Sequence, residues 1–156
     1  MTTAGGPYVA VVGGGGAGDE LCSQALEVGR LLAERGAVVV CGGLGGVMEA
    51  VCRGVRDGAG VSIGLLPGAD RSGANPWVTY TVPTGMGEGR NALVARSADA
   101  MIAVGGEYGT LSEMALALRA GTPVFGLSSW ELPEVVAVTT AAEAVDRAWA
   151  AVQPTT

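Results

Sequence analysis

The sequence predicts a single α/β domain of the Rossmann type, in which helices cover both faces of a doubly wound, mainly parallel sheet. Apolar runs of five or six residues alternate with stretches of helical periodicity. Most of these runs are almost entirely apolar, as is typical of strands buried on both faces. Because no linker or internal repeat divides the chain, residues 1–156 are expected to form one nucleotide- or phosphate-binding domain.

Taken in chain order, the strands differ in how clearly the sequence marks them. The first is rich in valine and ends in a run of glycines, whereas the fourth contains two threonines and is weaker. The last, "EVVAVT", is expected to be short. The predicted strands are 8–12, 37–41, 61–66, 78–82, 100–104, 123–127 and 134–139.

The helices show apolar residues at helical spacing, and their ends carry recognisable signals. In the first helix, Asp19 and Glu20 suit the positive end of the helix dipole, and Gly36 suits the position after the last turn. Gly58 and Gly121 end two further helices in the same way. The predicted helices are 19–36, 47–58, 90–98, 111–121 and 141–152.

The composition excludes several kinds of chemistry. The chain has no histidine and no lysine, and all nine basic residues are arginine. This removes Ser-His-Asp and Cys-His nucleophiles, a lysine Schiff base with pyridoxal phosphate, and the P-loop. No clustered carboxylates or cysteines predict a metal site. A net charge of −6 without a basic stripe argues against nucleic acid as a partner.

The cysteines and the N-terminal residues bear on location. Cys22, Cys41 and Cys52 form no C-x-x-C pair, so we expect reduced, buried thiols in a cytoplasmic protein. The start, "MTTAGGPYVAVV", has neither a basic segment nor a long apolar run. We therefore expect no signal peptide and no membrane partner.

Glycines gather where strands feed helices, which is where parallel sheets bind ligands. Two such stretches are 13–20, "GGGGAGDE", and 41–49, "CGGLGGVME". A dinucleotide site is disfavoured because the second strand ends in Cys-Gly-Gly and not in an acid. Tight strand–helix packing is the alternative to phosphate binding. The candidate phosphate-binding residues in these loops are Gly14, Gly15, Gly43, Gly45 and Gly46.

A third stretch, "VGGEYGTLSE", follows the strand 100–104. Thr110 and Glu113 have the spacing of a capping box, in which Glu113 would only close a helix start. Alternatively, Glu113 is a carboxylate beside a breaking glycosidic bond. Tyr108 can stack on a heterocycle or close the loop. Both alternatives remain open for each residue.

The segment "RNALVARSADAMIAVGGEYGTLSEMALAL" resembles the signature region of the LOG-like ("lonely guy") phosphoribohydrolases, formerly mislabelled lysine decarboxylases. That family pairs R-K with P-G-G-x-G-T-x-x-E, and "CGGLGGVMEAV" resembles its second glycine loop. The resemblance implies hydrolysis of a nucleoside 5′-monophosphate to free base and ribose 5-phosphate, without a required cofactor. It implies a homodimer or homotetramer. It makes Arg90 and Glu113 the catalytic pair, and Gly106, Gly109 and Thr110 match the second motif.

Three departures bear on this reading. The family's lysine is Asn91, its proline is Gly105, and its second glycine is Glu107, whose carboxylate weakens anion binding unless it points away. Asn91 can bind a ligand or cap a turn. The segment 65–78, "LLPGADRSGANPWV", is more similar to a compact LOG-like subgroup that includes the molybdenum cofactor carrier proteins, which bind a phosphorylated pterin without catalysis. The resemblance therefore implies a phosphoribohydrolase, which we take as the leading hypothesis, with a non-catalytic molybdenum cofactor carrier or nucleotide sensor as the alternative.

Overall fold

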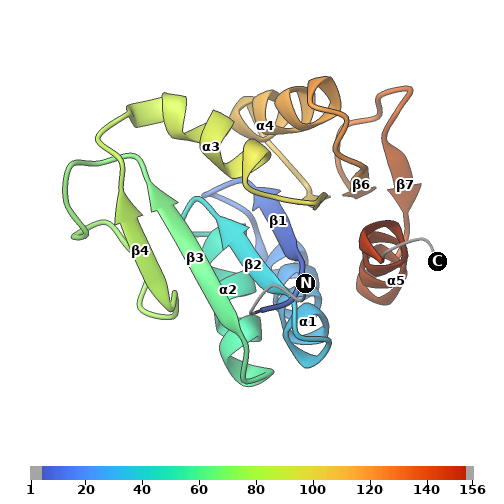
Figure 1. The fold of residues 1–156 in the computed structure, drawn as a ribbon, viewed down its shortest axis with the longest axis horizontal. Coiled ribbons are helices and arrows are strands. Elements are labelled where there is room, and N and C mark those ends of the chain that lie inside the picture. Colours follow the sequence, from blue (N-terminus) through green and yellow to red (C-terminus); the bar gives the residue numbers. More distant parts are fainter. Residues whose placement is uncertain (1–4, 154–156) are drawn as a thin grey trace.

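The computed structural model describes residues 5–153. Seven strands form one sheet with the order β4-β3-β2-β1-β5-β6-β7 (Figure 1). Every neighbouring pair is parallel, which confirms the predicted doubly wound sheet. The strands are β1 (Tyr8–Gly13), β2 (Val38–Cys41), β3 (Val61–Leu66), β4 (Tyr80–Pro83), β5 (Ala100–Val104), β6 (Val124–Leu127) and β7 (Val136–Val138).

Helices cover both faces of this sheet (Figure 1). The helices α1 (Asp19–Glu34), α2 (Val47–Asp57) and α5 (Ala141–Val152) pack on one face. On the other face lie α3 (Arg90–Arg96), which follows the short 3-10 helix η1 (Gly87–Gly89), and α4 (Tyr108–Arg119). None of the helices in residues 5–153 has the length and apolarity needed to cross a membrane.

Alternate side chains of each central strand enter the two cores. In β1, Val9 and Val11 pack towards α1 and α5, whereas Ala10 and Val12 pack towards α3 and α4. Each buried valine or leucine stabilises the fold by about 1.5–3 kcal/mol. The helices α1 and α2 cross so closely that only glycine fits at position 54. A Cβ there would lie 1.9 Å from the carbonyl oxygen of Leu26.

The fourth strand begins two residues later than its sequence predicts. Asn75 Oδ1 accepts hydrogen bonds from the backbone N–H groups of Trp77 and Val78, so this segment is a turn. Thr79 then bonds to Ser62 through their hydroxyls and backbone N–H groups, in place of the ladder. Side-chain hydrogen bonds therefore delay the start of β4 to Tyr80.

Candidate functional site

The two halves of the sheet diverge between β1 and β5, where Gly13 pairs with Val104. Ligands of doubly wound sheets bind beyond the carboxyl ends of the strands at such a switch point. Here the loops after β1 and β5 meet the starts of α3 and α4 around a cavity of about 150 Å³. Of the predicted site residues, the cavity brings together Gly14, Gly15, Arg90, Asn91, Gly109, Thr110 and Glu113.

The capping box predicted for Thr110 and Glu113 does not form. Helix α4 begins at Tyr108, its cap residue is Glu107 in extended conformation, and no side chain caps it. Gly105 and Gly106 have φ values of +61° and +142°, and they turn the chain so that the helix starts three residues early. A proline cannot adopt the φ of Gly105, so this loop differs in its backbone from the motif that it resembles.

This early start changes what the beginning of α4 can bind. The first residues of a helix have N–H groups without an intrahelical acceptor. In α4 the first hydrogen bond of the helical pattern is donated by the N–H of Leu111 to the carbonyl of Glu107. Gly109 and Thr110 precede it and line the cavity, so their N–H groups are available to an anion.

Glu113 lies one turn into α4 and faces the cavity with only 7% of its surface exposed. Burial raises the pKa of its carboxyl group to about 7, although the positive charge of Arg90 opposes this shift. At neutral pH both the protonated and the ionised form are populated. A carboxyl group of this kind can accept or donate a proton.

Arg90 opens α3 and is held beside Glu113. Its Nη1 donates to Asn91 Oδ1, whereas its buried Nε finds no acceptor within residues 5–153. A side chain at Gly42 would collide with this guanidinium, because a Cβ there would lie 2.7 Å from Arg90 Nη2. The sequence analysis did not identify Gly42 as a residue that makes room for Arg90. The one feature of the sequence that pointed to Gly42 was its place in the glycine-rich stretch 41–49.

Glu107 does not point away from the site. Its Oε1 would lie 3.0 Å from a Cβ built at Gly14, and the residue lines the cavity. The cavity therefore faces two carboxylates, Glu107 and Glu113, and one guanidinium. Any phosphate here is opposed by Glu107, as its place in the motif predicted.

The glycines of the second stretch, 41–49, do not line this cavity, although Met48 of the same stretch does. Val47 N–H donates to the carbonyl of Gly14, and a Cβ at Gly46 would lie 2.3 Å from that oxygen. The carbonyl of Gly43 accepts hydrogen bonds from Asn75 N–H and Nδ2. These contacts show packing, and the ligand-binding roles of Gly43, Gly45 and Gly46 stay predictions.

Tyr108 and Gly106 flank the cavity without lining it. Tyr108 is 81% exposed and stacks on Trp130 with ring centroids 5.9 Å apart. Trp130 Nε1 in turn donates to the carbonyl of Glu107. A Cβ at Gly106 would lie 2.8 Å from Thr110 Cγ2, so this glycine permits the tight turn into α4.

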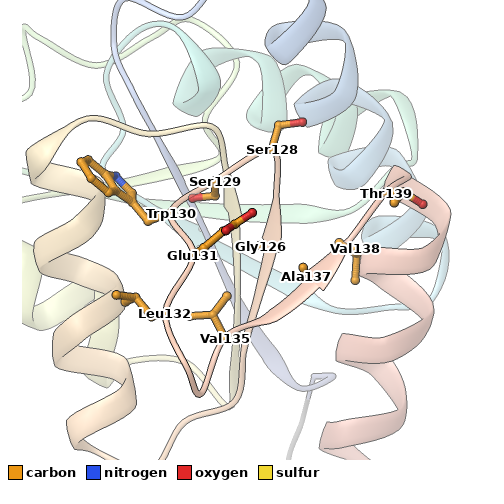
Figure 2. Close-up of a pocket in the computed structure, with 10 residues that line it drawn as sticks. All are labelled: Gly126, Ser128, Ser129, Trp130, Glu131, Leu132, Val135, Ala137, Val138 and Thr139. Carbon is orange, nitrogen blue, oxygen red and sulfur yellow. The ribbon is translucent and has the colours of Figure 1, made fainter.

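Two larger cavities are lined, within residues 5–153, by no buried charged side chain. One, of about 500 Å³, lies beside β6 and β7. Figure 2 shows its lining, with Trp130, Leu132 and Val135 on the connecting loop. Its one charged lining residue is Glu131. The other, about 730 Å³ between the starts of α1 and α2, includes Gly15, Gly46 and Arg53, together with Asp19 and Glu49. The burial of Glu113, and not the size of the cavity, therefore favours the cavity that it lines.

The model of the SLOG cluster4 family matches residues 6–154. The chain belongs to this family. An uncharacterised protein of Archaeoglobus fulgidus is 41% identical over 119 residues, which are 76% of this chain and 78% of that protein. The rice cytokinin riboside 5′-monophosphate phosphoribohydrolase LOG is 40% identical over 94 residues. That match covers 58% of this chain but only 38% of the rice protein.

Among solved structures, the molybdenum cofactor binding protein of Rippkaea orientalis is 29% identical and superposes with a TM-score of 0.91. The match covers 97% of this chain and 100% of that one. The predicted resemblance to LOG-like proteins and to their molybdenum cofactor subgroup is confirmed. A likeness to the single-stranded-DNA-binding processing protein A of Helicobacter pylori, at 20% identity, shows the shared fold alone.

Proposed function

We propose that this protein binds a phosphorylated, nucleotide-like ligand at the switch point and hydrolyses the N-glycosidic bond of a nucleoside 5′-monophosphate. One observation carries the proposal. Glu113 caps no helix, yet it is buried at the cavity with a pKa of about 7, beside Arg90. Burying a carboxyl group costs free energy of folding. Residues in clefts whose pKa values are strongly shifted are frequently functional.

In this proposal the phosphate binds at the start of α4. The uncapped N–H groups of Gly109 and Thr110 and the positive helix end favour an anion there. The guanidinium of Arg90, which lines the cavity, supplies further donors with a permanent charge. Glu107 reduces this attraction, which makes the site a weak phosphate site that depends on the rest of the ligand for affinity.

Glu113 then acts on the sugar. As the bond from the base nitrogen to C1′ breaks, its electron pair goes to the base, and positive charge develops on the ribose. The ionised carboxylate stabilises that charge and accepts a proton from the water molecule whose oxygen bonds to C1′. The proton taken up by Glu113 then passes to the base nitrogen that left C1′, which returns the carboxylate to its ionised form, and the products are free base and ribose 5-phosphate.

A second candidate function is the non-catalytic binding of a phosphorylated pterin, with molybdenum cofactor as cargo. It is favoured by the match to the Rippkaea orientalis protein along the full length of both chains. The rice hydrolase, by contrast, is matched over 38% of its length. The same donors, Arg90 and the start of α4, would hold the phosphate, and no catalytic task would fall to Glu113.

Base release separates the two candidates. Purified protein is incubated with AMP, N6-isopentenyl AMP and GMP, and free base is followed by chromatography. The hydrolase proposal expects release by the wild type and by Glu134→Gln, an exposed control, and loss of release in folded Glu113→Gln. If the folded wild type releases no base from any of them, the hydrolase proposal is wrong, and binding of a pterin phosphate is measured next.

We also propose that the protein is cytoplasmic and self-associates into a dimer or tetramer. The three cysteines are free, in keeping with a reducing compartment. Tyr80 and Val82 on the edge strand β4 and Leu93 on α3 are exposed apolar side chains that a second copy could cover. Light scattering coupled to gel filtration measures the assembly, and a monomer at micromolar concentration would contradict this proposal.

A further inference from the structure

A groove of about 450 Å³ adjoins the cavity that holds Glu113. It runs between the start of α3 and the first two turns of α4, and it shares Asn91 and Gly109 with the cavity. A ligand whose glycosidic bond lies beside Glu113 is too large for the cavity of about 150 Å³. The groove offers room for its heterocycle directly beyond Asn91 and Gly109.

One wall of the groove is an aromatic ring held in place. Tyr108 lines the groove, and its ring stacks on Trp130 at an interplanar angle of 25°. The indole is itself anchored by the hydrogen bond to the carbonyl of Glu107. An exposed tyrosine fixed in this way offers a flat surface to a heterocycle at little cost in side-chain entropy.

The groove carries one charged group, the carboxylate of Glu88 in η1. The hydroxyl of Ser112 donates to the carbonyl of Gly109 and accepts from Asn91 Nδ2, so these two side chains are engaged with the protein itself. The carboxylate of Glu88 is an acceptor only. It therefore favours a heterocycle that presents N–H donors.

The best match for one carboxylate is two adjacent N–H groups, which it can accept as a pair. A 2-amino-4-oxopyrimidine ring has this arrangement, with a ring N–H beside an amino group, and it occurs in both guanine and pterins. Adenine presents an amino group beside an unprotonated ring nitrogen, whose lone pair repels a carboxylate.

We propose that Glu88 and Tyr108 form a specificity site for a 2-amino-4-oxopyrimidine heterocycle, as found in guanine nucleotides or in pterin phosphates. This inference rests on the proposed function for the position of the phosphate and the sugar. It adds the class of heterocycle, which the phosphate site alone leaves undefined. The ligands of both candidate functions would then be recognised through the same ring N–H and amino group.

The test measures dissociation constants by isothermal titration calorimetry for GMP, AMP and 6-hydroxymethylpterin phosphate. Wild type is compared with Glu88→Gln, Tyr108→Leu and the exposed control Glu134→Gln. We expect GMP or the pterin phosphate to bind at least about tenfold more tightly than AMP, as for a lost pair of charge-assisted hydrogen bonds. Glu88→Gln should abolish most of this preference and leave AMP binding within about twofold, whereas Tyr108→Leu should weaken all three ligands alike.

The tighter of the two preferred ligands identifies the source of the heterocycle. Equal affinity for GMP, AMP and the pterin phosphate, or a preference that survives Glu88→Gln, would overturn the specificity site without affecting base release. If GMP or the pterin phosphate binds more tightly than AMP but no base is released, the specificity site is supported and the proposed hydrolase activity is contradicted. If no phosphorylated ligand binds to folded wild type, the proposed function and this inference both fail.

Discussion

Replacing the buried carboxyl group of Glu113 by an amide should change how stability depends on pH. The pKa of Glu113 is raised from 4.5 to about 7 in the folded protein, mainly by burial. The folded state therefore favours the protonated form. Its contribution to stability is complete below the unfolded pKa and is lost as pH rises through the folded pKa. Glu113→Gln keeps the shape and removes this loss.

The magnitude follows from the two pKa values. At about 1.4 kcal/mol per pH unit, the interval from 4.5 to about 7 corresponds to about 3 kcal/mol at alkaline pH. Part of this is already lost at pH 5, because the unfolded carboxyl group is largely ionised there. Between pH 5 and pH 8.5 the stability of Glu113→Gln relative to wild type should therefore rise by roughly 2–3 kcal/mol.

The assay is urea unfolding at both pH values, followed by circular dichroism, with Glu134→Gln as the exposed control. Glu134→Gln should change stability by less than about 0.5 kcal/mol at either pH. If the difference between Glu113→Gln and wild type is the same at pH 5 and pH 8.5, the carboxyl group is not desolvated as the structure indicates. The protonation argument for its role would then fail.

Three further predictions follow from the same contacts. Glu107→Gln removes a carboxylate from the cavity, so it should tighten binding of a phosphorylated ligand by up to about fivefold in calorimetry; unchanged or weaker binding would count against a phosphate there. The rate of base release should rise with pH around a midpoint near 7 in a stopped-time assay, because Glu113 must be ionised, and a flat profile would contradict its role as base. Gly54→Ala should cost at least about 2 kcal/mol in thermal unfolding, because its Cβ meets the α1 backbone, whereas Gly73→Ala, which meets only Leu44 Cδ2 at 3.6 Å, should cost little.

The fold could be predicted because its signals are local. Apolar runs mark the buried strands, and glycines such as Gly36 and Gly121, both with positive φ, mark helix ends as expected. The fourth strand was placed too early because the turn at Trp77 depends on the side chain of Asn75, and because Thr79 pairs with Ser62 in β3 through its hydroxyl. Such side-chain hydrogen bonds leave no periodic signal.

The candidate site was predicted in part. The spacing of Thr110 and Glu113 fits a capping box and a catalytic motif equally well, so the sequence could not separate them. The turn at Gly105 and Gly106, which starts the helix at Tyr108, decided against the cap. Gly42 and Glu88 were missed because their importance arises only when α3 is packed beside the strand ends.

A crystal structure of Glu113→Gln soaked with GMP tests the location and use of the site most directly, since this variant is expected to bind ligand without cleaving it. We predict phosphate density within hydrogen-bonding distance of the N–H groups of Gly109 and Thr110, with the ribose beside residue 113 and the base on Tyr108. Ligand density in the cavity beside β6 and β7, or beneath Trp77 between α1 and α2, with the switch-point cavity empty, would contradict the proposed site.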